Sequence, residues 1–391
     1  MKYKSLLSGM AALALAGLPG GCEKVIVSPA VEEESPSQPA VLLEDVARLL
    51  SVLPLGNEQL EEVYDAARAS AGNGYDEEYR MQELFSEPGA GVGDKISTKA
   101  DGYSRPLREL LREAALSTKA DGFLEDPEAW LAALESSDIQ IYWPFSEAWN
   151  GDSFPVVTFD PGGDVGSNEG YSLGTDGKVT KVLVTEEMAR EQPVWVVNRN
   201  SDAEYKTLEM LRREDPSWGQ GGGDLVVSKA DTDSEIKTLV LRTFKARRQF
   251  DSWFAGASEF WVKIGSIEDF TASTEAELRL YQPTITDFLM VVRRAEVGMD
   301  LTFNAVLVSE WTPQLSSAAL MIVEDDGGTQ TSWKCSATVK YNSKSYGFDL
   351  DLPLRTRDDI VWRGNLTRSY IEKYNGQQIG LGDVELVLEL I

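Results

Sequence analysis

The alternation of apolar and polar residues divides the chain into a helical part and a strand-rich part. Between residues 41 and 136, apolar side chains recur at the spacing of one helical face, and Pro54 and Gly72 interrupt the pattern. This spacing predicts helices over residues 41–53, 58–70, 76–85, 106–116 and 126–135.

From residue 139 onward the apolar period becomes that of strands. Short apolar runs end at Pro, Gly, Asn or Asp, and an Asp-Gly turn at residues 176–177 predicts a hairpin. Residues 342–344 are expected to form a second hairpin loop. After the Gly-rich stretch at residues 219–223, the expected strands are residues 239–247, 259–264, 276–281, 287–292, 301–308, 318–323, 336–341, 346–352 and 383–390.

Regularly spaced strands with almost no helix between them are typical of an antiparallel sandwich. The predicted fold class is therefore α+β, with an N-terminal helical region, a β-rich segment and a C-terminal antiparallel β-sandwich. The expected domains are a helical region at residues 41–136, a small β-rich domain at residues 137–230 and a β-sandwich domain at residues 231–391.

The first residues are typical of a lipoprotein signal. Lys2 and Lys4 precede an apolar run at residues 6–18 that is too short to span a bilayer, and small residues lead to Cys22. We expect residues 1–21 to be a signal peptide and Cys22 to carry the lipid after cleavage. Residues 22–40, rich in Pro, Ser and Glu, are expected to be a flexible linker.

Composition excludes several classes of function. The 391-residue chain contains 37 Lys and Arg against 64 Asp and Glu, a formal net charge of −27, so nucleic acid is an unsuitable partner and the membrane partner must be reached through the lipid on Cys22. The chain has no histidine, which excludes His-dependent catalysis and His-ligated metal sites within this chain. Chemistry based on carboxylates remains open.

An acidic cluster follows one of the expected strands. Carboxylates on neighbouring sandwich loops supply the oxygen ligands that calcium prefers, although Asp-Asp-Gly-Gly is also ordinary turn chemistry and favours a solvated turn. No other cofactor is expected. The candidate calcium ligands are Glu324, Asp325, Asp326, Asp358 and Asp359.

Aromatic residues near turns and strand ends suggest a second kind of site. Exposed rings can stack on sugars, whereas buried rings fill the core, and core packing is the favoured interpretation. The residues concerned are 142–145, 149, 218, 253–254 and 260–261.

Four segments, together with the signal, resemble uncharacterised exported lipoproteins of Bacteroidota. They are residues 74–79 (GYDEEY), 141–146 (IYWPFS), 193–198 (PVWVVN) and 253–260 (WFAGASEF). The resemblance implies an exported lipoprotein with a helical N-terminal part and a β-rich C-terminal part, and it implies no established activity.

These observations favour a membrane-tethered lipoprotein of the cell envelope over a catalyst. We expect an outer-membrane lipoprotein on the periplasmic face or the cell surface, acting as a non-catalytic binding or interaction module for a glycan or a protein ligand. The alternative is a carboxylate-dependent, glycosidase-like hydrolase, which would require two facing carboxylates in a cleft.

Overall fold

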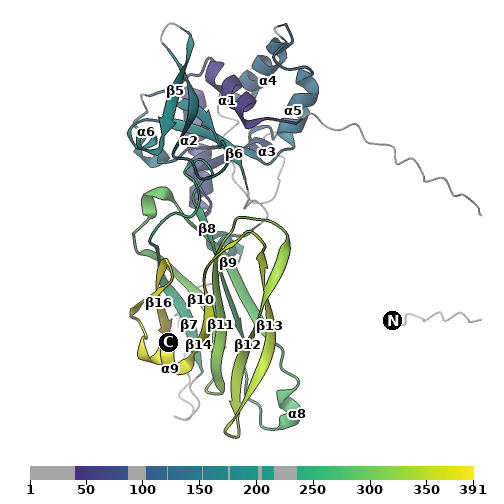
Figure 1. Ribbon diagram of the computed structural model, residues 1–391, viewed down its shortest axis with the longest axis vertical. Helices are drawn as coiled ribbons and strands as arrows, with labels where there is room; N and C mark the ends of the chain where they lie inside the picture. The colour runs from purple at the N-terminus through teal and green to yellow at the C-terminus, as the bar shows by residue number, and fades with distance from the viewer. Residues whose placement is uncertain are drawn as a thin grey trace, which may run out of the picture. The chain divides into compact units, whose positions relative to one another are not determined.

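The computed structural model describes residues 40–86, 103–120, 122–151, 153–174, 177–200, 205–214 and 236–391 (Figure 1). The fold class is α+β, as the periodicity predicts: helices come first, and antiparallel sheets dominate toward the C-terminus. The expected signal peptide, the lipidation site Cys22 and Trp218 lie outside the described residues. Of the expected linker, only Ala40 is described.

Helices form most of the structure before residue 136. Apolar residues spaced three and four apart face inward on the longer helices, and the Asp126 carboxylate caps the last of these helices by accepting a hydrogen bond from the Ala129 N–H. The helices are α1 (Leu43–Val52), α2 (Asn57–Gly72), α3 (Met81–Leu84), α4 (Leu107–Ser117) and α5 (Pro127–Glu135).

The first sheet has six strands in the order β1-β2-β6-β3-β4-β5. Its neighbouring strands are antiparallel except β3 and β6, which are parallel. The helices and one face of this sheet bury their apolar side chains in one hydrophobic cluster, so the boundary expected after residue 136 falls inside a shared core. The strands are β1 (Glu78–Arg80), β2 (Ile139–Tyr142), β3 (Val156–Phe159), β4 (Ser167–Leu173), β5 (Val179–Thr185) and β6 (Val194–Arg199). Helix α6 (Glu186–Glu191) contacts β5, whereas α7 (Leu208–Glu214) lies against the strand at residues 284–292 of the later part.

The helix predicted over residues 76–85 is wrong. Residues 78–80 pair with β2 as strand β1, and only the short helix α3 follows them. Two acids before β1 hold the chain extended by binding distant backbone: Asp76 accepts from the Ala257 N–H at 2.8 Å, and Glu77 accepts from two amides near residue 145. Tertiary hydrogen bonds therefore override the local helical period.

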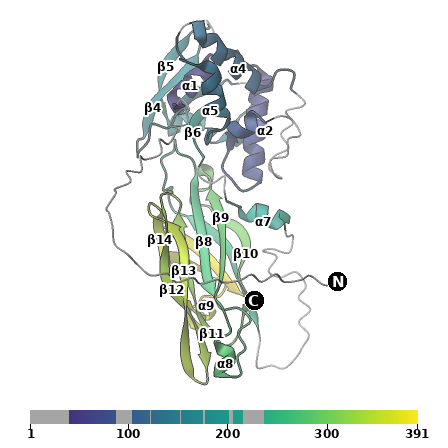
Figure 2. The same cartoon turned by 90° about the vertical axis from the view of Figure 1, so that its right-hand side faces the viewer.

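Residues after 236 form two antiparallel sheets that enclose one large hydrophobic cluster (Figure 2). One sheet has the order β10-β7-β16-β15, and the other has the order β13-β12-β11-β8-β9 with β14 also paired to β11. The elements are β7 (Lys237–Ala246), β8 (Ser258–Ser266), α8 (Glu275–Leu278), β9 (Thr284–Val292), β10 (Leu301–Trp311), β11 (Leu315–Glu324), β12 (Gln330–Tyr341), β13 (Lys344–Arg355), β14 (Asp359–Thr367), α9 (Arg368–Lys373), β15 (Gln378–Leu381) and β16 (Val384–Leu390).

One predicted strand of this part is wrong, and two strands were not predicted. Residues 276–281 contain the end of α8, because the Thr274 hydroxyl accepts from the Glu277 N–H and Glu277 accepts from the Ser273 N–H, which together cap a helical turn. The strands β14 and β15 carry polar residues that obscure the two-residue period. The hairpin predicted at residues 342–344 is confirmed by the pairing of Tyr341 with Lys344.

A loop between β7 and β8 connects the sandwich with the first sheet. Trp253 and Phe254 in this loop are buried in a cluster with Tyr142 and Val196. The Asn198 amide donates to the carbonyls of Phe254 and Ala255 at 3.0 and 2.6 Å. The loop is therefore fixed by both apolar and polar contacts to β2 and β6.

Among the residues that the structure describes, no helix is both long enough and apolar enough to cross a membrane.

Candidate functional site

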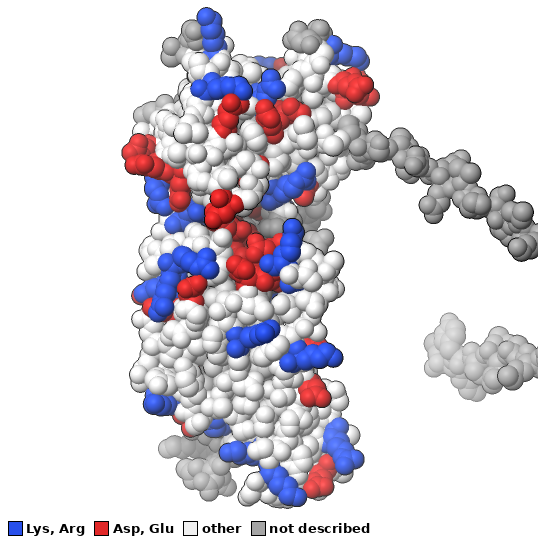
Figure 3. Space-filling model, viewed as in Figure 1, with Lys and Arg blue, Asp and Glu red and all other residues white. Residues whose placement is uncertain are grey.

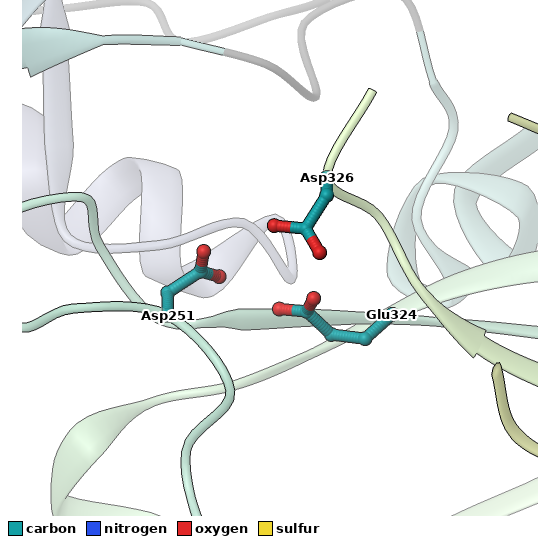
Figure 4. Close-up of side chains that lie close together, drawn as sticks. All are labelled: Asp251, Glu324 and Asp326. Atoms are coloured by element: carbon teal, nitrogen blue, oxygen red, sulfur yellow. The ribbon is translucent and has the colours of Figure 1, made fainter. Parts of the chain in front are cut away.

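Three carboxylates from two segments point toward one another at the end of the sandwich strands (Figure 4). They belong to Asp251, Glu324 and Asp326, and each offers an oxygen within 4.8 Å of the others. Within the described ranges, this is the group of three acidic or thiol side chains whose ligand atoms come close enough to hold one metal ion. We call these residues the acidic triad.

The local fold explains how the acidic triad is assembled. Glu324 is the last residue of β11, where it pairs with Phe260 of β8 and with Asp359 of β14. Asp326 follows it by two residues, just before Gly327 and Gly328, whose φ angles of 71° and 100° turn the chain away from the strand. A tight turn therefore places Asp326 over Glu324.

Asp251 comes from the loop between β7 and β8. Arg294 holds this loop: its guanidinium donates to the Asp251 carbonyl at 2.8 Å and to the Gly256 carbonyl at 3.0 Å. Because Arg294 is almost fully buried, these bonds fix the loop firmly and present the Asp251 carboxylate to Glu324.

Glu324 is the unusual member of the acidic triad. Its side chain is fully buried, with 0% exposure, and no N–H or hydroxyl group of the described residues donates to its carboxylate oxygens. Its hydrogen-bonding neighbour is another acid, Asp251, and a hydrogen bond between the two requires a proton on one of them. Burial, and after it the neighbouring Asp251 carboxylate, raises the pKa of Glu324 to about 11. A buried charge without a partner is costly, so the site favours a proton or a bound cation beside Glu324.

The other two members have raised pKa values for related reasons. Partial desolvation raises the pKa of Asp326, which remains exposed, to about 6, and the charges of Asp251 and Asp359 add to this rise. Burial is also the main cause of the raised pKa of Asp251. The three carboxyl groups therefore resist carrying three negative charges at once, unless a cation lies between them.

The acidic triad borders an open pocket of about 410 Å³. Figure 3 shows acidic side chains gathered on one face of the molecule, with basic side chains at their border. Arg199 is the basic residue of the pocket wall, and it forms an ion pair with Asp138. The acidic residues that line the pocket are Asp160, Asp251, Glu259, Asp325 and Asp326.

Two of the predicted calcium ligands, Asp325 and Asp358, make other contacts. Asp325 accepts from the Trp261 indole N–H at 3.4 Å and from the Gly327 N–H at 2.9 Å, and it lies 3.6 Å from the Arg355 guanidinium. Asp358 accepts from the Arg355 N–H at 2.6 Å. These two acids therefore bind the turn and its neighbouring loop.

Asp359 lies opposite Glu324 in the β11–β14 ladder and is exposed. Its charge acts on Glu324 and Asp326, but its oxygens are outside the acidic triad. Of the five predicted ligands, the structure thus brings Glu324 and Asp326 together with Asp251, and Asp325, Asp358 and Asp359 lie outside this group. Sequence reasoning missed Asp251 because nothing in its neighbourhood shows that its loop folds back onto the end of β11.

The aromatic residues proposed as a sugar platform are mostly in the core. Trp143, Trp253 and Phe260 are at most 4% exposed, and Trp261 is 9% exposed. Trp149 is partly buried against the helical core. The described rings therefore favour core packing over stacking on a sugar.

No family model, curated protein or solved structure matches the chain.

Proposed function

We propose that this chain is a membrane-tethered binding protein of the cell envelope, exported as a lipoprotein with lipid on Cys22. The tether follows from the signal and from Cys22. The similarity to exported lipoproteins of Bacteroidota, carried by the four segments named above, is part of this proposal. The lipid holds the chain at the membrane, and the folded residues provide the surface that binds.

The observation that carries the binding function is the acidic pocket beside the acidic triad. Its wall includes five carboxylates, of which Asp325 lies 3.6 Å from the Arg355 guanidinium, and one guanidinium that is paired with Asp138. An open pocket of this charge attracts positively charged groups and repels phosphates and anionic lipid headgroups. We therefore propose that its ligand is a polypeptide segment rich in lysine or arginine.

Between a protein and a glycan, the pocket favours the protein. Glycan binding by aromatic stacking requires exposed rings, and the rings in question are buried. A basic segment needs only the charge that the pocket supplies, together with hydrogen-bond acceptors on its wall.

Binding of a fluorescent lysine-rich peptide, followed by anisotropy in the presence of a chelator, tests this proposal. Asp160→Asn combined with Asp326→Asn should weaken binding at least about tenfold, since a charge contact at an interface is worth on the order of 1.4 kcal/mol or more. Asp349→Asn, an exposed acid on β13 away from the pocket wall, is the matched control. Equal affinity of the double variant and the control, or no binding at all, would refute the proposal.

One observation favours a carboxylate-dependent hydrolase as the second candidate. Neighbouring carboxylates whose pKa values are driven apart are typical of acid–base pairs, and the pKa values of Glu324 and Asp326 are raised to about 11 and about 6. Full burial of Glu324 argues against it, because a glycosidic oxygen has to reach the acid. Release of nitrophenol from a panel of nitrophenyl glycosides that Glu324→Gln abolishes would establish the hydrolase.

A further inference from the structure

We infer that Asp251, Glu324 and Asp326 bind a calcium ion. The ligand oxygens of the three side chains lie within 4.8 Å of one another. Two oxygens on opposite sides of one calcium ion, each at about 2.3–2.6 Å, are about 4.6–5.2 Å apart. The acidic triad therefore already has the dimensions of a single coordination sphere.

Glu324 supplies an independent reason for a bound ion. Its carboxylate is fully buried, is directed at the other two carboxylates (Figure 4), and receives no hydrogen bond from an N–H or hydroxyl group of the described residues, so that its neighbour is the acid Asp251. Buried polar groups are almost always partnered, so such an exception needs an explanation. A cation between the three side chains is a partner that both oxygens of Glu324 can contact.

The donor set selects a hard cation. All three side chains offer carboxylate oxygen, with no sulfur or imidazole, and this disfavours zinc and copper. Magnesium keeps several waters and dehydrates reluctantly, whereas the buried Glu324 requires an ion that gives up water on that side. Calcium accepts irregular shells of six to eight oxygens, and the half-exposed pocket leaves room for water to complete them.

A calcium ion in this position would link two elements that are distant in sequence. Asp251 belongs to the loop that inserts Trp253 and Phe254 between residues of the first sheet, and Glu324 ends β11 of the sandwich. The ion would therefore strengthen the attachment of this loop to the sandwich. Binding should then be visible as added thermal stability of the whole chain.

The calcium site lies at the same pocket as the proposed peptide site. It rests on the proposed function only in that an exported protein meets calcium. The two are tested separately, because the calcium measurement uses the protein and the ion alone, whereas the peptide measurement is made with a chelator. Peptide binding without a calcium effect would refute the calcium site and leave the proposed function standing. A calcium effect without peptide binding would refute the proposed function and leave the calcium site standing.

The test is a thermal unfolding experiment on the full chain with a chelator or with about 10 mM calcium chloride. For a site with a Kd of about 0.1–1 mM, calcium should raise the Tm by about 2–5 °C. Glu324→Gln and Asp251→Asn should abolish the rise, and Asp349→Asn should retain it. In chelator, Glu324→Gln should melt at or near the wild-type temperature, because the amide is uncharged and has nearly the shape of the acid it replaces.

Terbium luminescence excited through tryptophan provides a second readout, since Trp253 lies two residues from Asp251. Terbium should give a signal that calcium competes away and that Asp326→Asn, a change at an exposed side chain, weakens. A wild-type Tm that calcium does not move would overturn the inference and favour a proton shared by Asp251 and Glu324. A calcium shift that survives Glu324→Gln would overturn it as well.

Discussion

Two buried glutamates show that burial alone does not define a site. Glu77 is buried, but its oxygens accept hydrogen bonds from the Phe145 N–H, the Ser146 N–H and the Ser146 hydroxyl at 2.8–3.2 Å. Glu324 is buried with no such donor. Glu77 therefore has a structural role at the turn after β2, whereas Glu324 lacks the partners that would explain it in that way.

The burial of Glu77 beside other acids leads to a prediction about pH. Burial, followed by the neighbouring Glu147 and Asp76, raises the pKa of Glu77 to about 9. A carboxyl group whose folded pKa exceeds its unfolded value contributes stability that is fully present below the unfolded pKa of about 4.5 and is lost as pH rises through the folded pKa. Stability should therefore fall between about pH 5 and pH 9.

Glu147→Gln should make this fall smaller, because it removes a negative neighbour and lowers the pKa of Glu77 toward its ordinary value. We expect a difference on the order of 1 kcal/mol in the pH-dependent loss, which corresponds to a shift of about one pKa unit. Urea unfolding at about pH 5, 7 and 9 measures it. Glu187→Gln, an exposed acid on α6, is the control, and identical pH profiles for the two variants would contradict this account.

At the scale of elements, periodicity predicted most of the sandwich and failed where side chains act on distant backbone. The strands with clean alternation, such as β13 and β16, were found because one face meets the core and the other meets water. The helix expected at residues 76–85 failed because Asp76 and Glu77 bind amides far along the chain. Such bonds depend on the tertiary fold, and they produce no periodic pattern in the local sequence.

The hairpin between β12 and β13 allows a stabilising substitution. Asn342 and Ser343 have φ angles of 47° and 62°, the left-handed conformation in which serine is strained and glycine is not. Ser343→Gly should raise the free energy of unfolding by about 0.5–1 kcal/mol. Chemical denaturation measures it against Ser345→Gly, which removes a side chain within β13 and should destabilise. A loss from both substitutions would show that the turn is not strained.

The loop between β7 and β8 should be essential to the fold around the first sheet. Phe254 is fully buried in the cluster with Tyr142 and Val196, so Phe254→Ala leaves a cavity and should cost about 3–5 kcal/mol of unfolding free energy. Phe154→Ala, at a side chain that is 56% exposed, should cost less than about 1 kcal/mol. Similar denaturation midpoints for the two variants would mean that the loop does not anchor the sheet.

At the scale of the whole molecule, the sequence predicted the class of fold but only part of the candidate site. Glu324 and Asp326 are neighbours in the chain, and their acidity drew attention to them. Asp251 is brought to them by the pairing of β8 with β11 and by the buried Arg294, which no local pattern reveals. The pocket wall could not be predicted from local sequence either. Asp160 follows β3 of the first sheet, far along the chain from the other acids that line the pocket.

We expect the lipid on Cys22 to be what attaches the chain to the membrane. Cys22→Ala should move the protein from the membrane fraction to the soluble fraction and abolish labelling with a radioactive or clickable fatty acid, because residues 6–18 are too short to remain as an anchor. Fractionation of cells that express the parent and the variant decides this. A Cys22→Ala chain that stays with the membrane would refute lipid anchoring.

The central claim is that Asp251, Glu324 and Asp326 accept positive charge, and anomalous diffraction from calcium-soaked crystals tests it most directly. We predict one anomalous peak within about 2.3–2.6 Å of an oxygen of each of the three carboxylates, and no such peak in crystals of Glu324→Gln. Density that shows no ion at saturating calcium, with the Asp251 and Glu324 carboxyl groups within hydrogen-bonding distance of each other, would contradict it.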